Sequence, residues 1–277
     1  MIRPPAHPDD APPVIRLVGL RKSFARTRVL DDLSLDFPEG LTTVVLGPSG
    51  CGKSVMLKHI VGLLRPDAGE VWYRETRVDT IRERRLTGVR RDIGFLFQMG
   101  ALFDSMTVEE NILFPLREHT KLSHRECRAE VERVLNLVGL ADVIHAMPAN
   151  LSGGQRKRIA LARTIVTDPK VVLFDEPTTG LDPIRSDVIN ELIIKLKHEL
   201  TCTNIVVTHD LTSAFKVADR LVMLHDGRVV AEGTPDAIRR SADPIVQRFL
   251  QGEASLDELA FIRAKQDDAH RGKVRHA

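Results

Sequence analysis

The sequence predicts an α/β protein, and three observations support this fold class. An apolar run at residues 41–46 leads into a glycine-rich turn, and a helix-prone run at residues 55–64 leads out of it. The apolar runs Val171–Phe174 and Asn204–Thr208 have the character of strands buried on both faces. Between about Met99 and Thr164 the chain has helical signals and no strong strand candidate. We therefore expect an α/β domain that carries an all-helical insertion.

The N-terminal region is expected to begin with a disordered segment, which is followed by two extended strands. Residues 1–13 are rich in Pro and Asp and contain no apolar core of the kind that a signal peptide needs. Apolar and polar residues then alternate over Val14–Leu20 and Leu33–Phe37, as they do in half-buried strands.

The glycine-rich turn fits a phosphate-binding loop. Residues 47–54 read GPSGCGKS and match the pattern G-x-x-x-x-G-K-[ST] in the required strand–turn–helix context. Glycines let successive backbone N–H groups point at a phosphate chain, and the helix that follows adds its positive end. Lys53 is expected to reach the β- and γ-phosphates, and the Ser54 hydroxyl to ligate Mg²⁺. The segment predicts binding of a nucleoside triphosphate.

The middle of the chain continues with a turn, two strands and the helical insertion. A turn at residues 66–69 precedes an expected strand at Glu70–Tyr73, and a further strand is expected over Arg90–Phe97, ending at Gln98. Capping-box pairs then open two helices, Thr107 with Glu110 and Ser123 with Glu126, and Gly139 ends the second helix.

The second half of the chain alternates buried strands with helices. Leu-Ser-Gly-Gly-Gln at residues 151–155 precedes a basic helix, and two glycines before a helix form another anion site. Asp182 caps a helix that begins at Pro183 and runs to about Leu200. Asp226-Gly227 indicates a hairpin, and Thr234-Pro235 opens a short helix.

Three polar residues follow the two buried strands. Asp175 and Glu176 end the first strand, and their adjacent positions face in different directions. This arrangement suits an Asp175 that holds Mg²⁺ through water and a Glu176 that polarises the attacking water. His209 follows the second strand, where a neutral imidazole can hydrogen-bond the γ-phosphate.

Composition limits the other classes of function. The 277 residues are 43% hydrophobic and 28% charged, and no apolar run approaches the ~20 residues of a membrane span. We expect a cytosolic chain whose membrane role comes through a partner. A net charge of +2 argues against nucleic acid as the main partner, and Arg82–Arg85 and the basic end from Arg271 are interpreted as solvated surface. The three cysteines, Cys51, Cys127 and Cys202, suggest neither disulfides nor a zinc site.

The ordered set of motifs resembles the nucleotide-binding subunit of ABC transporters. The set comprises Gly47–Ser54, Gln98, Leu151–Gln155, Val171–Glu176, Leu181-Asp182 and His209, and the resemblance covers about residues 14–240. It implies a P-loop ATPase with a RecA-like α/β core, an antiparallel β subdomain, and a helical subdomain inserted at about residues 99–164. Residues 241–277 are then a charged C-terminal extension.

This resemblance also implies a composite site and its partners. Two ATP molecules would lie between the P-loop of one subunit and residues 152–155 of the other. Phe24 would stack on adenine, Gln98 would touch Mg²⁺ and water, and Asp182 would communicate across the interface. Glu176 would be the general base and His209 would steady the γ-phosphate. The expected nucleotide-binding residues are Phe24, Gly47, Pro48, Ser49, Gly50, Cys51, Gly52, Lys53, Ser54, Val55, Ser152, Gly153, Gly154, Gln155 and Asp182, and the expected metal ligands are Ser54, Gln98 and Asp175.

A narrower resemblance concerns residues 96–120, LFQMGALFDSMTVEENILFPLREHT, and residues 243–250. Both segments look like the ATPases of Mla and Mce lipid-transport systems. The likeness implies a membrane permease, an MCE-domain lipid-binding protein and a small STAS-like subunit as partners, at the cytoplasmic side of the inner membrane. The apolar residues at 99–103 are either local core or a surface for the permease; we expect some of each.

Several alternatives stay open on the sequence alone. The chain fits an ATPase for lipid transport, an ATPase for a polar solute, or a soluble ABC ATPase outside transport. Phe24 suits a core position as well as an adenine contact. Val55 replaces a Thr of many relatives, at an expected cost of ~1 kcal/mol in nucleotide binding. Cys51 is either a thiol with a lowered pKa at a helix N-terminus or a small residue that fills the loop.

Overall fold

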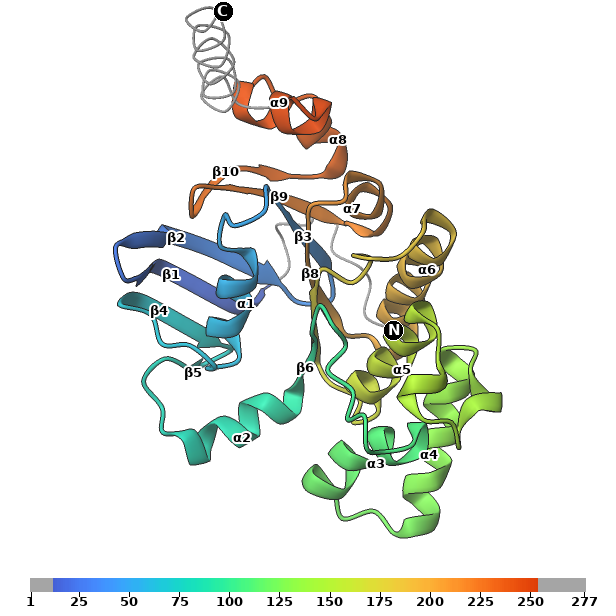
Figure 1. Cartoon of the computed structure of the whole chain (residues 1–277). Helices are drawn as coiled ribbons and strands as arrows, with labels where there is room; N and C mark the ends of the chain where they lie inside the picture. Colours follow the sequence, from blue (N-terminus) through green and yellow to red (C-terminus); the bar gives the residue numbers. More distant parts are fainter. Residues whose placement is uncertain (1–11, 254–277) are drawn as a thin grey trace, which may run out of the picture.

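The computed structural model describes residues 12–253, which form two β-sheets surrounded by helices (Figure 1). Residues 1–11 and 254–277 lie outside the described residues. The predicted disorder therefore falls outside the described residues except at residues 12 and 13, and it is wrong at Pro13, which begins β1. Most of the predicted C-terminal extension also lies outside the described residues.

The smaller sheet is antiparallel and contains the predicted N-terminal strands. Its order is β2-β1-β4-β5. The strands at 14–20, 33–37 and 70–73 are confirmed, and each is longer than predicted because the pairing continues beyond the clearly alternating residues. The bounds are β1 Pro13–Phe24, β2 Thr27–Pro38, β4 Ala68–Tyr73 and β5 Thr76–Arg77.

The larger sheet has the order β10-β9-β3-β8-β7-β6 and is parallel except at the edge strand β10. Alternate residues serve two cores: Val44 packs toward the helical side, and Val45 packs toward the smaller sheet. The hairpin at Asp226-Gly227 is confirmed. The bounds are β3 Thr42–Leu46, β6 Ile93–Leu96, β7 Val171–Asp175, β8 Thr203–Thr208, β9 Arg220–His225 and β10 Arg228–Gly233.

The helices flank the larger sheet and extend from it. Figure 1 shows α3 and α4 grouped beside α5 at one end of the molecule. Both predicted capping boxes are present, Asp182 caps α6, and Gly139 follows α4 with φ +67°. The bounds are α1 Lys53–Ile60, α3 Val108–His119, α4 His124–Leu137, α5 Gly153–Ile165, α6 Pro183–Leu200 and α7 Leu211–Val217, with short 3-10 turns at Ala141–Val143 and Pro148–Asn150.

The predicted strand over Arg90–Phe97 is wrong in its first part. Residues up to Asp92 belong to helix α2 (Glu83–Asp92), and only Ile93–Leu96 form a strand. Leu86 and Val89, three residues apart, bury one face of this helix. Arg90 then fixes its C-terminal turn by donating to the carbonyl oxygens of Val61 and Gly62.

Two short helices end the described chain at the opposite end from α3 and α4 (Figure 1). The helix predicted at Thr234-Pro235 is α8 (Pro235–Arg239), and α9 spans Pro244–Gln251. Among residues 12–253, no helix combines the length and the apolar character needed to cross a lipid bilayer.

Candidate nucleotide site

The candidate site lies where parallel strands of the larger sheet end. The loop after β3, the end of β7 and the residue after β8 meet there, because carboxyl ends of parallel strands share one edge of a sheet. They line an open cavity of about 330 Å³. Its lining residues are Val29, Ser49, Gly50, Gly52, Lys53, Ser54, Val55, Gln98, Glu176 and His209. All except Val29, which β2 supplies, were selected from the sequence.

Two glycines of the loop are required by close approaches. A Cβ atom on Gly47 would lie 2.2 Å from the carbonyl oxygen of Leu224. A Cβ atom on Gly52 would lie 2.8 Å from the carbonyl oxygen of Val29, and Gly52 also has φ +104°. Gly52 is the N-cap of α1 and provides no side-chain cap. The first N–H groups of α1 are therefore left for an anion.

Lys53 is buried at the start of α1, with 5% of the side chain exposed. Its Nζ donates to the carbonyl oxygens of Gly47, at 2.7 Å, and Pro48, at 3.0 Å. It also lies 3.7 Å from Oε1 of Glu176. The ammonium group is thus held over the loop by the loop's own backbone, next to the carboxylate at the end of β7.

Ser54 and Asp175 form a direct link between α1 and β7. The Ser54 hydroxyl donates to Oδ1 of Asp175 at 2.6 Å. Burial raises the pKa of Asp175, the Ser54 hydrogen bond opposes this shift, and the nearby negative charge of Glu176 adds to it. A hydroxyl and a carboxylate thus lie together beside the cavity, and both are oxygen ligands of the type that Mg²⁺ prefers.

Glu176 points into a polar cluster instead of toward Asp175. Its Oε2 accepts hydrogen bonds from Thr179 at 3.2 Å and Thr208 at 3.3 Å, and it lies 2.9 Å from Nδ1 of His209. Its backbone has φ +48°, which is uncommon for a residue with a side chain. Such conformations persist where the surroundings hold them, and they concentrate at functional sites.

The contact between His209 and Glu176 constrains the imidazole. An ionised carboxylate only accepts hydrogen bonds, so Nδ1 must carry the proton in this contact. A neutral ring then presents Nε2 as an acceptor. To donate to a phosphate from Nε2 while keeping this contact, His209 must be protonated on both nitrogens. The neutral imidazole expected from the sequence does not fit both contacts at once.

Lys157 is a residue of the site that sequence reasoning missed. It was included in the basic helix after residue 155, yet its side chain is buried and reaches back to the cavity wall. Its Nζ donates to the carbonyl oxygen of Gln98 and, at 3.3 Å, to that of Glu176. Burial lowers its pKa, and the charges of Asp175 and Glu176 oppose this shift. Its sequence neighbours, Arg156 and Arg158, are also basic, so no local signal sets Lys157 apart from them.

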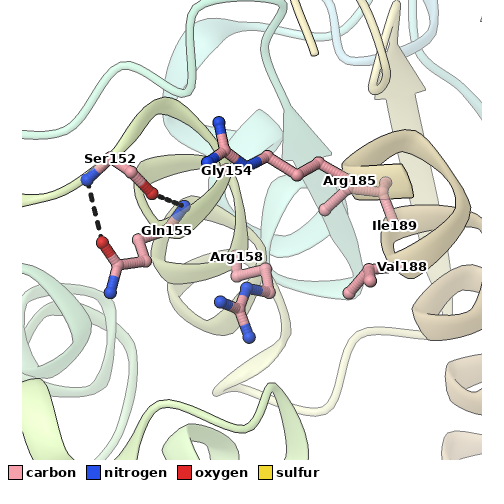
Figure 2. Close-up of a pocket in the computed structure, with 7 residues that line it drawn as sticks. All are labelled: Ser152, Gly154, Gln155, Arg158, Arg185, Val188 and Ile189. Atoms are coloured by element: carbon pink, nitrogen blue, oxygen red, sulfur yellow. Dashed lines mark hydrogen bonds between the residues drawn. The ribbon is translucent and has the colours of Figure 1, made fainter. Parts of the chain in front are cut away.

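Residues 152–155 do not line the nucleotide cavity. Ser152, Gly154 and Gln155 line a separate pocket of about 110 Å³ with Arg158 of α5 and residues of α6 (Figure 2). Ser152 caps α5: its Oγ accepts from the Gln155 N–H at 3.3 Å, and the Gln155 side chain accepts from the Ser152 N–H at 2.9 Å. The Ser152 hydroxyl proton is still available to a ligand.

Arg185 adds a positive charge to this second pocket. Figure 2 shows its side chain extending from α6 toward Gly154. A Cβ atom on Gly154 would lie 3.2 Å from Cδ of Arg185, so the glycine allows this approach. Asp182 lies 3.3 Å from Nε of Arg185 and also accepts from its backbone N–H. Sequence reasoning selected Asp182 but did not identify Arg185.

Phe24 ends β1 outside the lining of the nucleotide cavity. Its side chain is 45% exposed, which argues against a core position. The ammonium group of Lys22 lies 5.6 Å from the ring centroid. The ring is therefore accessible at the hairpin end of β1 and β2, where Phe24 pairs with Thr27.

The idea that Cys51 has a lowered thiol pKa is wrong. Cys51 is buried, and this burial raises the pKa of its thiol; Lys53 opposes the shift but does not overcome it. Its Sγ fills the space beside Gly47, 2.8 Å from where a Cβ atom on Gly47 would stand. Cys51 is thus a small residue that fills the loop.

The apolar residues after Gln98 divide into core and surface, as the sequence led us to expect. Leu102 packs against the core of the helical side. Met99 is 89% exposed, and Phe103 and Phe114 are 40% and 41% exposed, with ring centroids 5.1 Å apart. We call Met99, Phe103 and Phe114 the apolar patch. Phe114, on α3, was not singled out from the sequence.

Comparison with known proteins agrees with this geometry. The profile of the ABC transporter family matches residues 30–179. The chain is 42% identical to the probable ribonucleotide transport ATP-binding protein mkl of Mycobacterium leprae over 86% of this chain and 69% of that protein. It is 40% identical to the intermembrane phospholipid transport system ATP-binding protein MlaF of Escherichia coli K12 over 87% of this chain and 91% of that protein.

Solved structures show the same likeness. A dimeric ATP-binding cassette in a post-hydrolysis state with ADP and Pi has a TM-score of 0.74 and 34% identity, and covers 80% of this chain and 98% of its own. A second structure, cbiO1 of Clostridium perfringens, is part of the transporter complex cbiONQ. Its alignment with this chain has a TM-score of 0.76 and 27% sequence identity. The alignment covers 91% of this chain and 99% of the cbiO1 chain.

Proposed function

The chain belongs to the ABC transporter family, and we propose that it is an ATP-hydrolysing subunit that energises lipid transport through a separate permease. The observation that carries this proposal is the cavity itself, where Lys53, Glu176 and His209 meet beside the glycine-rich loop and the uncapped start of α1. These residues provide phosphate binding and a base at the same place.

Each residue has a role that follows from its contacts. The loop N–H groups and Lys53 bind the phosphate chain, and Lys53 exchanges its bonds to Gly47 and Pro48 for phosphate oxygens. Glu176 orients a water molecule and accepts its proton as the water oxygen attacks the γ-phosphorus, while the bond from that phosphorus to the bridging oxygen breaks and ADP leaves. Thr208 and Thr179 hold the Glu176 carboxylate in place for this step.

Mg²⁺ fits the residues present. Ser54 and Asp175 are already in contact beside the cavity, and Gln98 lines the same cavity. A bound Mg²⁺ would neutralise charge on the phosphates, and Ser54, with Asp175 through water, would hold it.

A second copy of the chain completes the site. The pocket of Ser152 and Arg185 shares no residue with the nucleotide cavity, yet it offers helix N–H groups, a hydroxyl proton and a cation. We infer that it binds the phosphates held by the other subunit, so that two ATP molecules lie in one dimer. The dimeric cassette that the chain resembles supports this inference.

The apolar patch supports a permease as the further partner. The exposed Met99, which follows Gln98 in the chain, and the paired rings of Phe103 and Phe114 suit contact with a cytoplasmic helix of a membrane protein. The name of the Escherichia coli relative favours phospholipid as the transported substrate. The name of the Mycobacterium leprae relative gives the second candidate, a ribonucleotide. An MCE-domain protein and a STAS-like subunit remain part of the proposal for the lipid system.

Purification of the complex from membranes tests the substrate. The tagged full chain would be isolated in mild detergent, and the bound proteins and lipids identified by mass spectrometry. We expect an integral-membrane permease and co-purified phospholipid, with ATPase activity stimulated by added phospholipid. Stimulation by ribonucleotide instead, without bound lipid, would reject lipid transport but keep the ATPase.

A further inference from the structure

Helix α2 presents a row of arginines that the nucleotide site does not use. Leu86 and Val89 bury one side of the helix. Arg84 and Arg91, seven residues apart, lie on the opposite side, and Thr87 and Gly88 between them are also exposed. A Cβ atom on Gly88 would meet nothing within 4 Å, so this face is open. Along this face, the exposed residues between the two arginines, Thr87 and Gly88, are small.

The acidic groups of α2 do not neutralise this face. Glu83 pairs with Arg90, which also binds the carbonyl oxygens of Val61 and Gly62. Asp92 accepts from the hydroxyl of Tyr73. Within residues 12–253, no acidic side chain forms an ion pair with Arg84 or Arg91. Arg82 and Arg85 are exposed beside them and add to the positive charge.

The position of α2 points to one kind of partner. Figure 1 shows α2 and α3 at the same end of the molecule, away from α8 and α9. The apolar patch, which includes Phe114 of α3, lies on that side of the chain. Guanidinium groups without an acidic partner, at the end of the molecule that carries the apolar patch, match the surface of an anionic bilayer.

We propose that the outer face of α2, formed by Arg84, Thr87, Gly88 and Arg91, binds anionic phospholipid headgroups of the membrane beside the permease. The inference rests on the proposed function, since the permease brings this end of the subunit to the bilayer. Planar guanidinium groups bind phosphate oxygens in pairs, and a face with only small residues between them suits a layer of phosphates. Lipid contact would hold the subunit in a fixed orientation while the dimer opens and closes.

Vesicle binding by the full chain tests this proposal without the permease. The variant Arg84→Gln/Arg91→Gln removes both charges and keeps good helix formers at exposed positions. The matched control Lys195→Gln/Arg240→Gln removes two exposed positive charges from α6 and the residue after α8. Co-sedimentation would be measured with phosphatidylcholine vesicles and with vesicles that also contain phosphatidylglycerol.

We expect the parent and the control to bind the phosphatidylglycerol vesicles, and the α2 variant to bind at least about tenfold more weakly. The binding should weaken with added salt. Equal binding by the α2 variant and the control would overturn the proposal. So would a variant that binds vesicles normally but loses the permease in neutral detergent, because α2 would then bind an acidic protein segment.

The test is independent of the proposed function. ATP hydrolysis by the α2 variant in solution should match that of the parent, because α2 contributes no residue to the lining of the nucleotide cavity. A chain that hydrolyses ATP and joins a permease but ignores anionic vesicles rejects the lipid contact alone. A chain that binds vesicles through α2 but hydrolyses no ATP rejects the proposed function alone.

Discussion

At the scale of single residues, the site separates two adjacent carboxylates into different surroundings. Asp175 contacts Ser54, whereas Glu176 turns at φ +48° toward His209 and two threonines. This turn suits the two roles that we propose, Asp175 toward a cation and Glu176 toward water. The positive φ of Glu176 is an unfavourable backbone conformation, and it is what directs the two carboxylates to different surroundings.

Asp175 is expected to lower the stability of the nucleotide-free protein. Its pKa is raised by burial, so ionisation is less favourable in the folded chain than in the unfolded chain. This cost in stability is absent at acid pH, where Asp175 is protonated in both the folded and the unfolded chain. It develops as the pH rises from the pKa of Asp175 in the unfolded chain through its higher pKa in the folded chain. Asp175→Asn should therefore raise the unfolding free energy near neutral pH by about 1 kcal/mol, or the melting temperature by about 2 °C.

Thermal unfolding without nucleotide checks this prediction. The difference between variant and parent should shrink as the pH is lowered, and the variant should lose Mg²⁺-dependent ATP binding. A variant that is less stable than the parent at neutral pH would show that the Asp175 charge stabilises the fold.

Lys157 is expected to act on turnover through the residues that it holds. Lys157→Met removes the donor to the carbonyl oxygens of Gln98 and Glu176 and keeps the apolar stem. We predict a fall in kcat of about tenfold with ATP affinity nearly unchanged, because a loss of about 1.4 kcal/mol would affect positioning and not phosphate binding. Lys157→Arg should restore part of the activity. Equal losses in ATP affinity and kcat for both variants would indicate damage to folding only.

At the scale of elements, α5 connects the apolar patch to both pockets. Lys157 binds Gln98, and Arg163, two turns further along, donates to the carbonyl oxygens of Gly100 and Ala101. The Arg163 guanidinium also lies 5.6 Å from the Phe103 ring centroid. The N-terminus of the same helix carries Ser152. A shift of α5 would therefore move the loop after Gln98. In this way α5 provides a physical route for coupling between the nucleotide cavity and the apolar patch.

The apolar patch should be needed for the permease and not for nucleotide. We predict that Met99→Glu/Phe103→Glu abolishes co-purification with the permease, because a charged surface cannot bury against an apolar helix. ATP binding by the isolated subunit should remain within about twofold of the parent, since neither side chain belongs to a buried core. Pull-down and ATP titration would measure the two effects. Leu102→Glu is the contrasting variant, because Leu102 packs against the core and its change should impair folding.

The same elements show which features a sequence can reveal. The loop at residues 47–54, the capping boxes and the strand-end residues are short-range patterns, so each was found from neighbouring residues. Lys157 reaches residues 59 and 19 positions away, and Val29 enters the cavity from another sheet. Arg90–Asp92 were assigned to a strand because their helix depends on contacts with the turn at residues 61–62. These features depend on tertiary structure.

At the scale of the whole molecule, one chain carries two pockets that share no lining residue, and we propose that each is one half of an ATP site. The nucleotide cavity holds Lys53 and Glu176, and the pocket of Ser152 and Arg185 lies apart from it. In the proposed function, two chains close on two ATP molecules. Hydrolysis would then separate the chains, and α5 would pass the change to the apolar patch.

The molar mass of Glu176→Gln in the presence of Mg²⁺ and ATP tests this requirement most directly. The variant keeps the phosphate-binding loop and loses the base, so ATP should bind and persist. Analytical ultracentrifugation should show a dimer of full-length chains with one ATP per chain, and the added change Ser152→Ala/Arg185→Ala should return the protein to monomers that still bind ATP. A Glu176→Gln protein that binds ATP and remains monomeric, or that hydrolyses ATP at the parent rate, would contradict the account.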